Sequence, residues 1–156
     1  MKDRDVVLCH PVRTAIGTFG GSLKEIPATD LGAAVIREAI RRSQLDATVG
    51  AVIMGNVIQA GNRMNPARQA ALHGGVAVSV PALTVNRVCG SGAQAILSAA
   101  QEILLGNVQV AVAGGMDRKF KLRDQYVLDL SGDREKKLDR RLAVALAVGL
   151  DTLQNR

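Results

Sequence analysis

The sequence has few residues of the kinds that build metal centres, disulfide frameworks or base-stacking surfaces. Its 156 residues include no tryptophan, one tyrosine, two phenylalanines and two histidines. The two cysteines, Cys9 and Cys89, have no paired spacing, which fits a reducing compartment and argues against a disulfide framework. With only His10 and His73 available, we expect no metal site. The scarcity of aromatic rings also leaves no stacking platform for nucleic acid.

Long apolar runs are missing as well. No run approaches the length of a membrane span, and the N-terminal segment MKDRDVVLCH is too short for a signal peptide. The sequence therefore predicts a cytoplasmic protein that makes no membrane contact.

Positive charge is concentrated near the end of the chain. The formal net charge is +6, and residues 118–156 hold ten Lys or Arg against six Asp or Glu. A basic balance could attract nucleic acid, an acidic membrane or a phosphorylated ligand, and does not choose among them. We interpret the basic band at Lys136, Lys137, Arg140 and Arg141 as a solvated face, with nucleic-acid binding as a minor alternative.

Small and β-branched residues dominate the rest of the composition, which is 47% hydrophobic with 16 glycines. This composition favours a layered α/β protein with closely packed helices and strands. Apolar runs predict strands at 6–9, 49–57 and 108–113, and helical periodicity predicts helices at 28–42 and 66–73. Thr29 or Asp30 is the expected cap of the first helix and Asn65 that of the second. The alternation predicts a mainly parallel sheet covered by helices.

The stretch from 81 to 105 organises the chain. It reads as a short buried strand, a glycine turn at 89–92 and a helix from 93 to 105. The expected strand residues are Leu83, Val85 and Val88, and the expected buried helix face is Ala93, Ile96, Leu97, Ala100 and Leu104.

Cys89 is thereby expected at a helix N-terminus. First-turn amides have no partner inside the helix, and the helix dipole adds partial positive charge there. Both effects favour a thiolate over a thiol. Gly90 and Gly92 are expected to permit the sharp turn and the close approach of a substrate to the backbone.

Several segments resemble the thiolases, the family of acetyl-CoA acetyltransferase and 3-ketoacyl-CoA thiolase. NRVCGSGAQAI is similar to the family's nucleophile motif. RTAIGTFGG, MGNVIQAGNRMNPARQAAL and LLGNVQVAVAGGMD match other family segments in the family's order. The resemblance implies a thiolase-like layered α/β fold, present as the N-terminal half only.

The resemblance also implies a function. Cys89 would take an acyl group from an acyl-CoA thioester, and its backbone NH is a candidate oxyanion donor. Coenzyme A would be a substrate, with no tightly bound cofactor, in an acyltransferase of fatty acid metabolism. A homo-oligomer or a complementing chain is the expected partner, and Arg63, Arg68 and Gln69 are either partner contacts or ordinary surface residues.

The resemblance ends at about Asp117, which predicts a partial thiolase domain at 1–117 and a divergent basic tail at 118–156. Leucines every four residues predict a tail helix at about 133–153. The family's second-half histidine, second cysteine and asparagine motif have no counterpart after Cys89. We therefore expect the isolated chain to be inactive or crippled. The alternative is a non-catalytic truncated remnant or interaction module that pairs with another chain.

A third hypothesis is that His10 acts as the general base for Cys89. It is the weakest, because the family resemblance places the catalytic histidine in the second half of the sequence.

Overall fold

The computed structural model describes residues 5–18, 20–44, 48–117 and 144–149. The described elements are, in chain order, β1 (Val6–Val12), α1 (Ala28–Ser43), β2 (Ala51–Gly55), α2 (Pro66–His73), β3 (Ala82–Val85), α3 (Ser91–Leu104), β4 (Val110–Gly115) and β5 (Val144–Gly149). Most of the expected elements exist, and their ends differ from the expected ones by a few residues.

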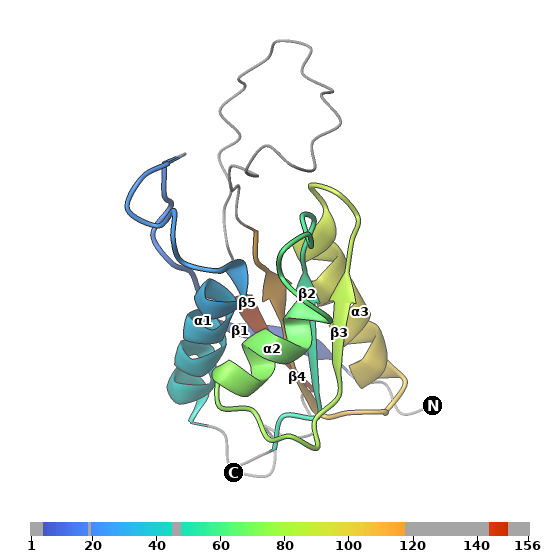
Figure 1. Ribbon diagram of the computed structural model, residues 1–156. Coiled ribbons are helices and arrows are strands. Elements are labelled where there is room, and N and C mark those ends of the chain that lie inside the picture. Colours follow the sequence, from blue (N-terminus) through green and yellow to red (C-terminus); the bar gives the residue numbers. More distant parts are fainter. Residues whose placement is uncertain (1–4, 19, 45–47, 118–143, 150–156) are drawn as a thin grey trace.

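The strands form one sheet in the order β1-β5-β4-β2-β3. β2 pairs in parallel with both β3 and β4, whereas β5 is antiparallel to β4 and to β1. β1, β2, β3 and β4 therefore run the same way and β5 runs against them. The expected α/β fold with a mainly parallel sheet is confirmed. The carboxyl ends of β2, β3 and β4 consequently meet at one end of the sheet (Figure 1).

Helices cover both faces of this sheet (Figure 1). Side chains alternate along a strand, so each central strand contributes to two cores. In β2, Val52 and Met54 pack on the side of α1 and α2, whereas Ala51 and Ile53 pack on the side of α3. In β4 the same alternation places valines toward α1 and α2 and alanines toward α3. The small residues allow α3 to lie close to the sheet.

The predicted N-terminal caps of α1 and α2 have different outcomes. α2 begins as predicted, because the Asn65 side chain accepts a hydrogen bond from the backbone N of Arg68 at 3.1 Å. α1 also begins where predicted, at Ala28, but its N-cap is Pro27 and no side chain caps it. Thr29 and Asp30 lie inside its first turn, so the prediction that either caps the helix is wrong. The carbonyl of Pro27 already accepts hydrogen bonds from Asp30 and Leu31.

The buried face of α3 also differs from the predicted one. Its buried residues are Ser91, Ala95, Ala99 and Ile103, whereas Leu97 is 54% exposed and Leu104 is 47% exposed. The predicted face was Ala93, Ile96, Leu97, Ala100 and Leu104, and none of these five residues is fully buried. In the structure Ala95 and Ala99 face β2 and β4, and Ile103 is the one large side chain among the buried residues of α3.

The predicted tail helix at 133–153 is wrong over residues 144–149, which form β5. The leucine spacing suggested a helix, but the run VALAV also alternates large and small residues with the period of a strand. β5 lies between β1 and β4 and pairs with both, and two ladders of backbone hydrogen bonds outweigh local propensity. The remainder of the predicted helix lies outside the described residues.

Candidate active site

Cys89 lies in the connection between β3 and α3. β3 ends at Val85 and α3 begins at Ser91 with Gly90 as its N-cap, so Cys89 directly precedes the cap. Its side chain is exposed. The predicted location at the start of a helix is confirmed, and it coincides with the end of the sheet where β2 and β4 also terminate.

The strand before Cys89 is shorter and less buried than predicted. Leu83 is 52% exposed on an edge strand, and Val88 lies outside the strand with its side chain 65% exposed. The backbone of Val88 is left-handed, with φ of +48°. That conformation is rare for a β-branched residue and costs on the order of 1–3 kcal/mol. The strained residue Val88 is therefore the immediate neighbour of Cys89, the candidate nucleophile.

Two side chains support this turn. The hydroxyl of Ser91 donates to the carbonyl of Val88 at 2.6 Å and accepts from the backbone N of Arg87 at 2.9 Å. The side-chain oxygen of Asn86 accepts from the backbone N of Val88 at 3.1 Å. Ser91 is buried, and the bonds to Val88 and Arg87 satisfy its hydroxyl. Sequence reasoning missed both residues, although a serine at a helix start is a recognisable signal.

Backbone amides around Cys89 are mostly engaged. Gly90 donates to the carbonyl of Arg87, and Ser91 donates to that of Val88. The amide of Cys89 has no hydrogen-bond partner in the part of the chain that the structure describes. It stays the candidate donor to an oxygen atom of a ligand.

The closest backbone approach involves glycines other than those predicted. A Cβ on Gly55 would lie 2.5 Å from the carbonyl carbon of Ser91, and one on Gly115 would lie 3.1 Å from the Cα of Gly92. A Cβ on Gly90 or Gly92 would meet nothing closer than 3.4 Å, and neither glycine has a positive φ. The glycines at the ends of β2 and β4 thus let α3 start against the sheet.

A buried polar network follows the same strand ends. Asn56 is fully buried, and its side-chain N donates to the carbonyl of Met116 at 2.7 Å. One carboxylate oxygen of Asp117 accepts from the backbone N of Val57 at 3.0 Å and from that of Ile58 at 3.2 Å. This network ties the loop after β2 to the end of β4. Polar residues directly after two apolar strands were the available signal for it.

His10 is not placed to serve Cys89. It lies in β1, at the opposite edge of the sheet from β3, with β5, β4 and β2 between them. At about 4.8 Å per strand, β1 and β3 lie roughly 19 Å apart. The described residues include no hydrogen bond between His10 and Cys89, so we do not adopt His10 as the base. His73 ends α2 and pairs with Asp30 instead, at 3.2 Å.

The second cysteine has a different environment. Cys9 lies in β1, packs against the core shared by α1 and α2, and is half-buried. Burial raises the pKa of the Cys9 thiol. No group of three potential metal ligands occurs among the residues that the structure describes. Within the same residues, no helix is both long and apolar enough to cross a bilayer.

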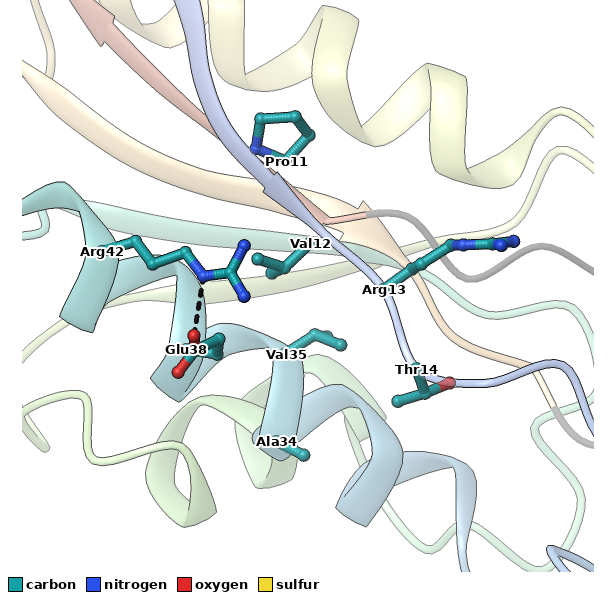
Figure 2. Close-up of a pocket in the computed structure, with 8 residues that line it drawn as sticks. All are labelled: Pro11, Val12, Arg13, Thr14, Ala34, Val35, Glu38 and Arg42. Atoms are coloured by element: carbon teal, nitrogen blue, oxygen red, sulfur yellow. Dashed lines mark hydrogen bonds and ion pairs between the residues drawn. The ribbon is translucent and has the colours of Figure 1, made fainter.

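A separate hollow of about 390 Å³ lies between the end of β1 and α1 (Figure 2). Its charged wall is the pair of Arg42 and Glu38, 2.6 Å apart, and Arg13 points away from that pair (Figure 2). Hydrogen bonds from Arg41 and Arg42 lower the pKa of Glu38 to about 2. Glu38 and Arg42 in this hollow are already paired with each other, and neither Cys89 nor a residue of its turn lines it.

Two of the candidate partner contacts are used within the chain. Arg68 donates to the carbonyls of Val78 and Val80, each at 2.5 Å. Gln69 donates to the carbonyls of Asn62 and Met64. These residues fix the loops on either side of α2, and a role in contacting a partner stays a prediction.

Comparison with known proteins identifies the family. A family model described as thiolase, N-terminal domain, matches residues 6–131. The chain belongs to the thiolase family. This thiolase match extends past residue 117, where the sequence resemblance was expected to stop.

Individual thiolases agree closely with the chain. It is 58% identical over 116 residues to beta-ketothiolase BktB of Cupriavidus necator, and 53% identical over 115 residues to acetyl-CoA acetyltransferase of Escherichia coli. Each comparison covers 73% of this chain and 29% of the relative. The crystal structure of acetyl-CoA acetyltransferase from Bacillus anthracis matches with a TM-score of 0.69 and 36% identity, covering 86% of this chain and 36% of that one. The chain therefore spans about a third of the length of these thiolases.

Proposed function

We propose that this thiolase-family chain carries the nucleophile of an acyltransferase site, and that Cys89 accepts an acyl group from acyl-CoA. The observation that carries the proposal is the exposed Cys89 thiol directly before the N-cap of α3, at the end of the sheet where three parallel strands finish. The names of the relatives, acetyl-CoA acetyltransferase and beta-ketothiolase, support the choice of an acyl-CoA substrate.

The proposed step is a thioester exchange. The sulfur of Cys89 forms a bond to the acyl carbonyl carbon, and the bond between that carbon and the sulfur of coenzyme A breaks. The proton lost by the Cys89 thiol ends on the released coenzyme A thiol. In the second step the acyl group passes to another coenzyme A or to the carbanion of a second acyl-CoA.

Backbone geometry supplies part of the stabilisation that this step needs. Negative charge develops on the carbonyl oxygen when the sulfur attacks, and a preorganised N–H donor lowers the energy of that state. The unpartnered amide of Cys89 is one such donor. Coenzyme A enters this scheme as a substrate and leaves as a product, so no tightly bound cofactor is required.

The described residues place no histidine beside Cys89, and the base expected from the family lies in sequence that this chain does not match. Loss of a general base or of an oxyanion donor each costs about 10² or more in rate. We therefore expect slow acylation of Cys89, at most one acyl group per chain, and little sustained turnover.

Release of free coenzyme A tests the proposal. The chain mixed with acetyl-CoA should release coenzyme A thiol up to about one equivalent, measured by separating coenzyme A from acetyl-CoA on a column. Cys9→Ala should behave like the unsubstituted chain and Cys89→Ala should release none above the reagent blank. Equal release by Cys89→Ala would reject Cys89 as the acceptor. Sustained turnover abolished in Cys89→Ala would instead overturn the view that a further region is required.

A second candidate function is an interaction module, favoured by exposed leucines on α3 and at its C-cap. Leu97, Leu104 and Leu105 are 54%, 47% and 71% exposed, respectively. Leucines grouped in this way indicate a protein contact. The occupant we infer is a polypeptide that supplies the remaining thiolase sequence, because the relatives are more than three times as long as the part matched here.

Light scattering after size exclusion tests this contact. Mixed with the unmatched portion of the Escherichia coli relative, the chain should elute as a complex with the summed mass. Leu97→Lys combined with Leu104→Lys should lose the complex, whereas Gln109→Lys, at an exposed residue outside α3, should keep it. Elution of the unsubstituted chain at its own mass, with the added polypeptide separate, would reject the interaction.

A further inference from the structure

Both peptide groups of Val88 are bound by side chains. Asn86 accepts a hydrogen bond from the N–H of Val88 at 3.1 Å, and the Ser91 hydroxyl donates to the C=O of Val88 at 2.6 Å. These two contacts, which we name the Val88 clamp, act on the two backbone torsions of the residue that directly precedes Cys89.

The conformation of Val88 needs such support. Its φ of +48° is unfavourable for a β-branched residue. Its side chain is 65% exposed, so burial of the isopropyl group does not compensate for the strain. Among the described interactions, the hydrogen bonds to the N–H and the C=O of Val88 are the ones that stabilise its left-handed conformation.

The clamp is itself fixed to the sheet. The side-chain N of Asn86 donates to the carbonyl of Val57, in the loop after β2, at 3.1 Å. Ser91 is 3% exposed and its backbone lies against Gly55 at the end of β2. The direction of the chain at Cys89 is therefore set relative to the carboxyl end of β2.

We propose that Asn86 and Ser91 are positioning residues, which keep Val88 left-handed and thereby orient the sulfur of Cys89 for attack on a thioester. This inference rests on the proposed role of Cys89 as acyl acceptor. Neither side chain takes part in the bond changes. Each acts through the backbone of Val88. The backbone N of Ser91 also donates to the Val88 carbonyl, at 3.1 Å, but this bond leaves the N–H of Val88 unsupported. We infer that it does not hold the left-handed conformation alone, so that loss of either side chain lets φ at Val88 return to a negative value and turns Cys89.

The experiment uses Ser91→Ala and Asn86→Ala in the full chain. Ser98→Ala is the matched control, because Ser98 lies on the same helix and its hydroxyl bonds only to the side chain of Gln94 among the described contacts. Backbone chemical shifts from NMR report the sign of φ at Val88. Acylation of Cys89 by acetyl-CoA and alkylation by iodoacetamide are timed by mass spectrometry, since the small reagent needs no defined sulfur direction.

In each clamp variant we expect φ of Val88 to become negative, acylation to slow at least about tenfold, and alkylation to change less than about threefold. Ser98→Ala should match the unsubstituted chain in all three measurements. Adding Val88→Gly to Ser91→Ala should recover part of the acylation rate, since glycine adopts a positive φ without strain. Because Asn86 is exposed, Asn86→Ala keeps the test open if Ser91→Ala fails to fold.

Persistence of the left-handed Val88 in both variants would overturn the clamp. A change of φ that slowed acylation and alkylation equally would overturn the role of the clamp in orienting the sulfur. Failure of the proposed function looks different. The unsubstituted chain would then show no acylation of Cys89 at all, while the sign of φ in the variants would still decide whether the clamp exists.

Discussion

Gly55→Ala is expected to lower the free energy of unfolding by about 3 kcal/mol, the upper end of the usual cost of overpacking. The added methyl group would lie 2.5 Å from the carbonyl carbon of Ser91 and 2.7 Å from the backbone N of Gly92. These neighbours are backbone atoms at the start of a helix, so they cannot move aside as a flexible side chain would. Gly55 has no positive φ, and the effect is therefore steric.

Gly92→Ala is the matched control. Its methyl group would meet nothing closer than 3.5 Å, and it replaces a glycine in the first turn of α3. Alanine favours a helix over glycine by about 0.5–1 kcal/mol, so this variant should be as stable as the unsubstituted chain or slightly more stable. Urea unfolding followed by circular dichroism measures both. Equal stability of the two variants would show that α3 does not begin in contact with β2.

Iodoacetamide is expected to label Cys89 at least about tenfold faster than Cys9 in the folded chain at neutral pH. The Cys89 side chain is exposed beside the first turn of α3. Cys9 is half-buried, and burial raises the pKa of its thiol, which reduces the reactive thiolate at neutral pH. Raising the pH through the elevated pKa of Cys9 should generate that thiolate and narrow the difference in rate.

Two single-cysteine variants, Cys9→Ala and Cys89→Ala, separate the rates without peptide mapping. In strong urea both thiols should react at similar rates, because burial and the helix start are then lost. Faster labelling of Cys9 than of Cys89 in the folded chain would contradict the placement of Cys89 as the accessible nucleophile.

Local patterns predicted the parts of the fold that depend on local interactions. The apolar runs of β2 and β4 indicated buried strands, and Asn65 followed by Pro66 indicated the start of α2. The location of Cys89 before a helix followed from a strand pattern, a glycine turn and a helical pattern in succession. Each of these signals lies within a few residues of the feature that it predicts.

Features that depend on contacts between distant segments were not predicted. The need for glycine at position 55 arises from Ser91, which is 36 positions further along the chain. The buried face of α3 is set by how closely the alanines of β2 and β4 allow the helix to approach. β5 was missed because its partners, β1 and β4, are remote in sequence, and the local leucine spacing fits a helix as well.

The acceptor of the acyl group is proposed to be the sulfur of Cys89. Digestion of the folded chain after exposure to acetyl-CoA, followed by mass spectrometry at acidic pH to preserve thioesters, locates the acetyl group directly. We expect one acetyl group on the peptide that contains Cys89, removed by hydroxylamine, with Cys9 unmodified. An acetyl group on Cys9 or on lysines, with Cys89 unmodified, would contradict it.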